Sequence, residues 1–220
     1  MHRIDKLIRS KRKTLALEIG SNAELIVRAP LRMLDEEIFN FVELKETWIL
    51  RKKEAVLNRI AQRGVKKFVD DEEYLFLGKA YPLVITEEKE IKLSDYLHFP
   101  RRYLDSPKEH LIKWYKQEAL TVLTRRSEYF AEVPGLKYRS VKVTGAKKRL
   151  GSCGPNGNIN YSWRLIVTPQ SVIDYVVVHE LCHLEIKNHS QRFWNKVKTI
   201  LPDYKEQRRW LRKNRAALDI

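Results

Sequence analysis

The stretch VVVHELCHLEIKNHS, residues 176–190, holds three histidines and a glutamate directly after an apolar run. Residues 172–184 are apolar nearly all round, which predicts a buried helix. His179 and His183 are four residues apart, so a helix places both imidazoles on one face, and Glu180 lies about 100° round the axis. This is the H-E-x-x-H arrangement, in which two histidines hold zinc and the glutamate is the general base.

His189 is the third candidate ligand. On a continuous helix, a residue six positions after His183 would point away from the other two imidazoles. Asn188 tolerates a left-handed backbone, so we predict that the helix ends there and that the chain folds back. Three histidines with an open fourth position are typical of catalytic zinc. The sequence therefore predicts one Zn²⁺ per chain, held by His179, His183 and His189.

Two alternatives to this metal site stay open. His179, Glu180 and His183 could form a buried polar cluster without an ion, although an unpaired glutamate beside two histidines in an apolar helix is costly. His189 could be a histidine of a surface loop.

The composition describes a folded protein. A chain of 220 residues with 43% hydrophobic and 10% aromatic residues can bury a core and is too apolar for disorder. Cys153 and Cys182 are the only cysteines, so no disulfide framework is expected and a cytoplasmic location is predicted. No window approaches the roughly 20 apolar residues that cross a bilayer, and no signal-peptide pattern is present, so no membrane partner is expected.

The formal net charge is +15, with basic clusters at 9–13, 145–149 and 206–215. Such an excess favours anionic partners, and proximity to nucleic acid is one hypothesis. The other interpretation is a well-solvated basic surface. No zinc-finger spacing, RNP-like strand or KH loop accompanies the charge, so it indicates an anionic substrate or partner only in general.

Periodicity and turn residues predict an α+β fold. We expect a β-rich N-terminal region at 1–100, with one long helix at 35–63, and a second domain at 101–220. The predicted strands lie within 15–30, 72–93 and 140–167, and further helices lie within 106–130, 191–201 and the tail after 202.

Three groups of residues resemble one known family. They are HELCHLEIKNHSQRFW (179–194), RLGSCGPNGNINYSWRLIVTP (149–169), and the early IRSKRKTLALEI with LIVRAP. These residues are similar to the YgjP-like family of metal-dependent hydrolases, which is related to zincin peptidases, including the SprT-like ones that work near DNA. The resemblance covers nearly the whole chain. It implies that His179, His183 and His189 are zinc ligands and that Glu180 is the general base.

The resemblance also implies where substrate binds. Residues 101–220 would form a zincin-like metallopeptidase domain, with the active-site helix packed on a short, mainly antiparallel sheet. Gly151, Ser152 and Cys153 would form the strand beside the cleft. Arg149, which ends a basic run of three residues, could contact an anionic substrate or simply solubilise the loop.

Three positions depart from the patterns of related families. Leu150 stands where the YgjP-like family tends to have tryptophan, and Ser162 stands where it tends to have asparagine. Both bear on substrate preference more than on the chemistry. The spacing from His183 to His189 also matches the longer metzincin motif, but Ile186 occupies the place of that motif's glycine, so we do not assign the chain to the metzincins.

Three functional hypotheses follow. The main one is a zinc-dependent metallopeptidase that acts on a peptide or protein, with Glu180 taking a proton from water and passing it to the leaving amine. The second is a metal-dependent nucleoside triphosphate pyrophosphatase of the UTP type, although carboxylates with Mg²⁺ are more usual for that chemistry. The third, motivated by the net charge, is a nucleic-acid-associated protein with a secondary metal site.

Overall fold

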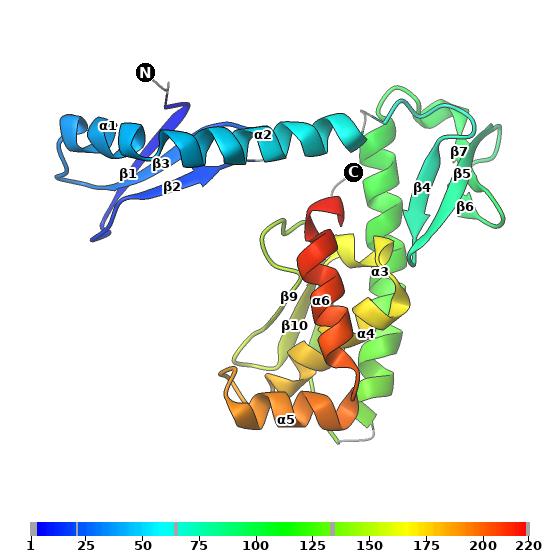
Figure 1. The fold of residues 1–220 in the computed structure, drawn as a ribbon. Coiled ribbons are helices and arrows are strands. Elements are labelled where there is room, and N and C mark those ends of the chain that lie inside the picture. Colours follow the sequence, from blue (N-terminus) through cyan, green and yellow to red (C-terminus); the bar gives the residue numbers. More distant parts are fainter. Residues whose placement is uncertain (1–3, 21, 64–65, 133–134, 219–220) are drawn as a thin grey trace. The chain divides into compact units, whose positions relative to one another are not determined.

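The computed structural model describes residues 4–20, 22–63, 66–132 and 135–218 (Figure 1). The chain consists of two compact units, Met1–Lys66 and Lys67–Ile220, and each has a hydrophobic core of its own. Both units combine helices with small sheets, which confirms the predicted α+β class. In the part of the chain that the structure describes, no helix is long and apolar enough to span a membrane.

The first unit packs two helices on a three-stranded sheet (Figure 1). Strand β3 is central, parallel to β1 and antiparallel to β2. Leu25, Val27 and Ala29 alternate along β3 and are fully buried, as expected for a strand with one face on a core. The strands predicted within 15–30 are confirmed, and β1 is an additional strand. The elements are β1 (Lys6–Ser10), β2 (Ala16–Ile19), β3 (Leu25–Pro30), α1 (Asp35–Leu44) and α2 (Glu46–Arg63).

The long helix predicted at 35–63 is wrong in one respect, because it is interrupted at Lys45. Helix α1 ends at Leu44 and α2 begins at Glu46. Val42 and Ile49 are buried in the same core on either side of the break. Their spacing of seven residues is also that of a continuous helix, and no Gly or Pro marks the interruption, so the apolar pattern does not reveal it.

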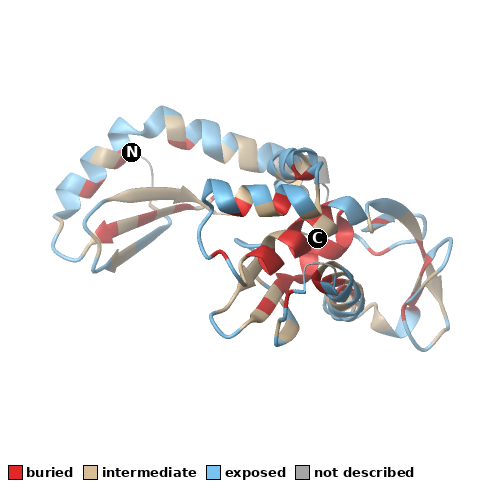
Figure 2. Cartoon of the chain, turned by 90° about the horizontal axis from the view of Figure 1, so that it is seen from below, coloured by how far each residue is buried: buried red, intermediate tan, exposed pale blue. Residues whose placement is uncertain are grey.

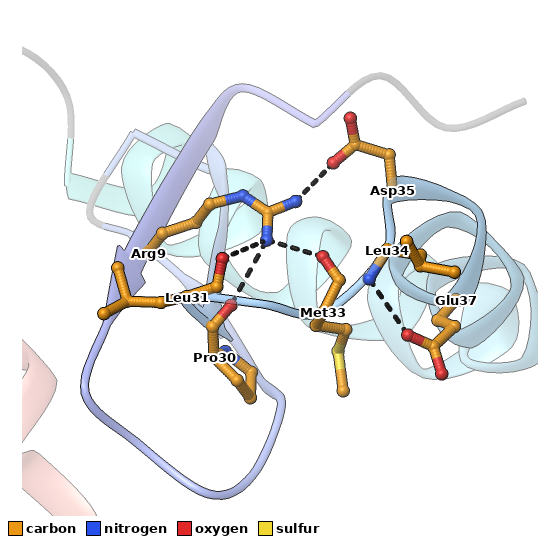
Figure 3. A network of polar contacts seen from close by, with 7 residues as sticks. All are labelled: Arg9, Pro30, Leu31, Met33, Leu34, Asp35 and Glu37. Carbon is orange, nitrogen blue, oxygen red and sulfur yellow. Dashed lines mark hydrogen bonds and ion pairs between the residues drawn. The ribbon is translucent and has the colours of Figure 1, made fainter.

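Arg9 ties the first strand to the start of α1 (Figure 3). Its guanidinium donates hydrogen bonds to the carbonyl oxygens of Pro30 (3.2 Å), Leu31 (3.4 Å) and Met33 (2.6 Å), and it forms an ion pair with Asp35. These bonds satisfy carbonyl groups in the connection between β3 and α1. One arginine of the basic cluster at 9–13 therefore stabilises the fold of this unit.

The second unit begins with a four-stranded sheet, ordered β4-β5-β7-β6, that packs near the start of the long helix α3 (Figure 1). Helix α3, Pro107–Glu132, has Pro107 at its first position, as predicted. Its buried residues Leu111, Tyr115, Ala119 and Leu123 recur every four positions and form one face. The strands are β4 (Glu73–Phe76), β5 (Lys79–Thr86), β6 (Lys92–Leu93) and β7 (Leu97–Pro100), followed by the 3-10 turn η1 (Arg101–Tyr103).

The division between compact units falls at residues 66–67, whereas the sequence placed a domain boundary near residue 100. Leu83 of β5 and Phe99 of β7 belong to the same core as Leu111 of α3. The four-stranded sheet is therefore part of the second unit. A functional division into 1–100 and 101–220 stays a prediction.

A third sheet lies in the C-terminal half of the second unit. Strand β10 is central, parallel to β8 and antiparallel to β9, so β9 is an edge strand. The sequence predicted two strands over 140–167, and the structure has three strands followed by a buried 3-10 helix. The sequence did not predict this 3-10 helix, whose residues 163–167 are all buried. The elements are β8 (Ser140–Thr144), β9 (Gly151–Cys153), β10 (Asn158–Ser162) and η2 (Trp163–Val167).

Helix α4, Gln170–Cys182, is surrounded by α3, α5, α6 and β9. The predicted burial of this helix is confirmed, and Figure 2 shows the dense group of buried residues in this unit. The elements after α4 are α5 (Gln191–Ile200), α6 (Tyr204–Asn214) and η3 (Arg215–Leu218).

Two contacts fix the start of α4. Arg126 of α3 donates two hydrogen bonds to the carboxylate of Asp174, at 2.6 and 3.0 Å. The hairpin between β4 and β5 touches the residue before the helix: a Cβ at Gly78, whose φ is +80°, would lie 2.8 Å from Cα of Pro169. Glycine is required there both by the positive φ and by the close approach. The N-terminal half of α4 is therefore held on two sides.

Candidate metal centre

The turn after α4 begins earlier than predicted. The sequence placed the end of the helix at Asn188, but α4 ends at Cys182 and His183 is its C-cap residue. The ring of His183 donates from Nδ1 to the carbonyl oxygen of Ile186 at 2.9 Å, and the side chain of Ile186 is buried. This hydrogen bond and the burial of Ile186 favour a change of chain direction over a further turn of α-helix. The chain reaches His189 through this turn.

The structure brings the three predicted ligands together. His189 Nε2 lies 3.0 Å from His179 Nε2 and 3.2 Å from His183 Nε2. The candidate ligand atoms of all three residues lie within 4.8 Å of one another. Nitrogen ligands placed tetrahedrally at 2.0–2.1 Å from one zinc ion are separated by about 3.3 Å. The spacing of these imidazoles is therefore compatible with one shared ion.

The hydrogen bond of His183 leaves a nitrogen lone pair in the centre of the cluster. Because Nδ1 of His183 donates to a carbonyl, the neutral ring has no proton on Nε2. Nδ1 of His179 is buried without a hydrogen-bond partner among the described residues, so the polar contact of this ring is made by Nε2, within the cluster. Converging nitrogen lone pairs repel one another unless a proton or a cation lies between them. The donor set fits a bound cation.

Electrostatics keep two of the three rings neutral. Burial lowers the pKa of His179 to about 3, and the neighbouring histidines and Arg208 add to this effect. Burial also lowers the pKa of His183, and its hydrogen bond to Ile186 opposes the change. Neutral imidazole is the form that ligates metals. These two rings are therefore ready to bind an ion at neutral pH.

Two aromatic residues of α5 hold the histidine rings. The ring of Phe193 is fully buried and stacks on His183, with ring centroids 4.5 Å apart. Trp194 stacks on His189 at 5.7 Å and lies 5.9 Å from His179. The sequence predicted a helix within 191–201 but no role for either aromatic residue at the metal site. The signal that could have found them is the pair of aromatics four and five residues after His189.

Glu180 is buried beside this cluster. Its side chain lies against Gly151 of β9, where a Cβ would come within 2.4 Å of Glu180 Oε1. Burial raises the pKa of Glu180 to about 7, and the positive charge of Arg149 opposes that rise. A carboxyl group whose pKa lies near neutrality can both accept and release a proton at physiological pH.

One of the residues predicted to bind substrate, Gly151, lies against Glu180. Gly151, Ser152 and Cys153 are strand β9, whose side facing away from β10 is the edge of the sheet. Burial raises the pKa of the Cys153 thiol, so it is not an activated nucleophile. Arg149 is exposed and precedes β9 by two residues. Their contact with substrate stays a prediction.

Ser162, one of the departures from the family pattern, stabilises the loop before β9. It is buried, and its hydroxyl donates to the carbonyl oxygen of Ala146 at 2.8 Å. The buried Arg164 donates to the carbonyl oxygen of Gly145 at 3.0 Å. Both bonds hold the start of the loop that carries Arg149. Ser162 therefore acts on the conformation of this loop.

Comparisons with known proteins place the chain in a family. Residues 13–214 match the family model described as YgjP-like, metallopeptidase domain. Curated proteins gave no match. The metallopeptidase zymogen of Pyrococcus abyssi abylysin is a similar solved structure, with 22% identity over 41% of this chain and 93% of that chain, at a TM-score of 0.38. A Wss1 mutant from Saccharomyces cerevisiae is similar at 20% identity over 42% of this chain and 84% of that chain, at a TM-score of 0.35.

Both structures overlap less than half of this chain. The family model, in contrast, spans nearly all of it, including both units and every residue of the candidate metal centre. The chain belongs to the YgjP-like metallopeptidase family.

Proposed function

We propose that this metallopeptidase uses zinc, with one Zn²⁺ held by His179, His183 and His189 and with Glu180 as the general base. The observation that carries the proposal is the convergence of three imidazole Nε2 atoms, one of them from His179, which directly precedes the buried Glu180 on α4. The two cysteines are free thiols, and we propose a reducing cytoplasm as the location.

The donor set supports zinc over the common hard cations. Mg²⁺ and Ca²⁺ prefer oxygen ligands, whereas imidazole suits zinc and its transition-metal neighbours. Three protein nitrogens leave one position open, as in catalytic zinc sites. When bound, such an ion supplies Lewis-acid polarisation of the scissile carbonyl. The nitrogen-only set is also why we favour peptide hydrolysis over cleavage of a nucleoside triphosphate.

Glu180 supplies the proton transfers. Its carboxylate takes a proton from the attacking water and then gives it to the nitrogen of the leaving amine. A pKa of about 7, set mainly by burial, allows one group to do both at neutral pH. The close contact with Gly151 fixes the position of the carboxylate. The pKa and the position of Glu180 therefore support its assignment as the general base.

The edge strand β9 supports an extended peptide as substrate. An edge strand presents backbone N–H and C=O groups that have no partner within the sheet. A peptide can add to such an edge as a further strand, with backbone hydrogen bonds giving affinity. Because β9 contains Gly151, a peptide paired there would lie next to Glu180. We propose that β9 aligns the substrate.

Chelation and replacement of the metal test the substrate class. The purified protein is stripped with a chelator, reloaded with zinc or magnesium, and assayed on casein, on a mixed set of peptides and on nucleoside triphosphates. We expect casein and peptide hydrolysis with zinc, little with magnesium, and none in the stripped protein. Release of pyrophosphate from a nucleotide without peptide cleavage would contradict the proposal.

A further inference from the structure

Arg208 of α6 lies beside the candidate metal centre but has no part in the proposed proton transfers. Its guanidinium lies over the ring of Trp194, 4.6 Å from the centroid. The same ring stacks on His189 at 5.7 Å and lies 5.9 Å from His179. One aromatic ring therefore links a fixed positive charge to two of the three proposed ligands.

The position of Arg208 is set by the helix that carries it. Tyr204 lies four residues earlier on α6, so both side chains are on the same face of the helix. The ring of Tyr204 is buried and stacks on Trp194, with centroids 5.5 Å apart and an interplanar angle of 14°. Stacking holds a planar guanidinium while its edge, which carries the N–H donors, stays available.

Among the residues that the structure describes, Arg208 has no carboxylate or carbonyl partner, and it is exposed. Other arginines differ: Arg126 is paired with Asp174, and Arg101 with Glu87. The face of α6 that carries Arg208 packs against the helix of the proposed ligands, because Tyr204 on that face stacks on Tyr175 of α4, with ring centroids 6.4 Å apart. The guanidinium is therefore a fixed donor group next to the site, without a partner within the described chain.

Two further cations lie around the site, on different elements. Arg149 is exposed and lies two residues before Gly151, whose backbone contacts Glu180. Lys187 is exposed in the turn between α4 and His189, next to Ile186, whose carbonyl oxygen accepts a hydrogen bond from His183. The neighbouring acid Glu185 is already paired with Lys196. Charges of one sign around a site raise the local concentration of ligands of the opposite sign.

We propose, on the basis of the proposed peptidase function, that Arg208 binds a carboxylate of the peptide substrate. The chain would then prefer substrates that have an acidic side chain within a few residues of the scissile bond. An arginine whose fork is held in place can bind a carboxylate through two parallel hydrogen bonds. Arg208 is thus a specificity-determining residue, and the substrate class is an acidic polypeptide segment.

The test uses zinc-loaded full-length protein and matched peptides that differ only by Glu or Gln at one position near the cleavage site. The Glu/Gln position is varied along the peptide. At the position where Glu helps most, we expect the wild type to cleave the Glu peptide with about tenfold higher kcat/KM than its Gln partner, the effect of one charge-assisted hydrogen bond. Arg208→Ala should remove this preference, so that its kcat/KM for the Glu peptide equals its kcat/KM for the Gln peptide. Arg209→Ala, an exposed arginine on another face of α6, should keep the preference.

A charge reversal separates recognition from packing. In Arg208→Glu the preference should change sign, so that a Lys peptide is cleaved faster than the Glu peptide, which loss of packing alone would not produce. Equal cleavage of Glu and Gln peptides by the wild type, or an unchanged preference in Arg208→Ala, would overturn the inference and leave the peptidase function standing.

Two other outcomes would also count against it. If the wild type cleaves no peptide, the proposed function fails together with the inference. If single-stranded DNA inhibits the wild type but not Arg208→Ala, while the Glu preference is the same in both, then the anion bound is nucleic acid and the proposed acidic peptide is wrong.

Discussion

The side chain of Glu180 packs on the backbone of Gly151, in the place that the Cβ of any other residue at position 151 would occupy. A Cβ there would lie 2.4 Å from Oε1 and 2.6 Å from Cγ of the glutamate. The carboxyl group of α4 thereby packs on the backbone of β9. The contact joins the proposed general base to the strand that we expect to bind the peptide, so both are positioned by one packing interaction.

Gly151→Ala should impair catalysis more than stability. The added methyl group must displace the glutamate side chain, because the backbone of β9 is held by its pairing with β10. A displacement of about 1 Å at a catalytic group can cost on the order of 100-fold in rate. We expect kcat to fall by that order while zinc content is unchanged. The control is Gly145→Ala, where an added Cβ meets no atom within 4 Å, and its rate should equal that of the wild type.

Glu180 should make the metal-free protein less stable as the pH rises. Its pKa is raised from 4.5 to about 7 in the fold, so the folded state binds the proton more tightly. The stabilisation is complete below pH 4.5 and is lost as the pH rises through 7. A rise of that size corresponds to about 3 kcal/mol.

Urea unfolding of the wild type and of Glu180→Gln, both with chelator, measures this effect. The histidines titrate in both proteins, so the difference in the free energy of unfolding isolates the glutamate. As the pH rises from 4.5 to 8, the free energy of unfolding of Glu180→Gln should increase by about 3 kcal/mol relative to that of the wild type. A difference that does not change with pH would show that Glu180 keeps an ordinary pKa.

Zinc should stabilise the chain through His189. A ligand that binds only the folded state stabilises it by about 4 kcal/mol at a thousandfold excess over Kd, which raises Tm. His189→Ala removes one of the three converging nitrogens and should abolish most of the shift in Tm. His110→Ala is the matched control, because His110 stacks on Tyr103 and takes no part in the cluster. A full shift in His189→Ala would exclude this residue as a ligand.

Arg126→Ala should destabilise the second unit. Arg126 and Asp174 are both mostly buried, at 16% and 14% side-chain exposure, and share two hydrogen bonds. Removal of the arginine leaves a buried carboxyl group without its partner, at a cost of about 3 kcal/mol in the free energy of unfolding. Chemical denaturation measures this loss. Arg125→Ala changes an exposed neighbour and should stay within about 0.5 kcal/mol of the wild type.

The sequence was informative where one periodic element carries the pattern. The four-residue spacing of His179 and His183 and the apolar run before them predicted a buried helix with both rings on one face. The need to bring His189 back predicted a break in that helix. The position of the break, at Cys182 and not Asn188, depends on a bond between His183 and the carbonyl of Ile186, which a periodic pattern does not contain.

Features that join distant segments could not be read from the chain. The contact of Gly151 with Glu180 depends on how α4 packs against an edge strand. The stack of Trp194, Tyr204 and Arg208 requires α5 and α6 to meet at one angle. Propensity and hydrophobic pattern describe single elements, and these contacts arise only when the elements pack together.

Casein hydrolysis by zinc-loaded wild type and Glu180→Gln, with zinc content measured in the same preparations, tests the central claim most directly. We predict one zinc per chain in both proteins and a rate for the Gln variant that is lower by about three orders of magnitude, the middle of the range for loss of a general base. Equal rates in the two proteins, or hydrolysis by a wild type that holds no metal, would contradict the account.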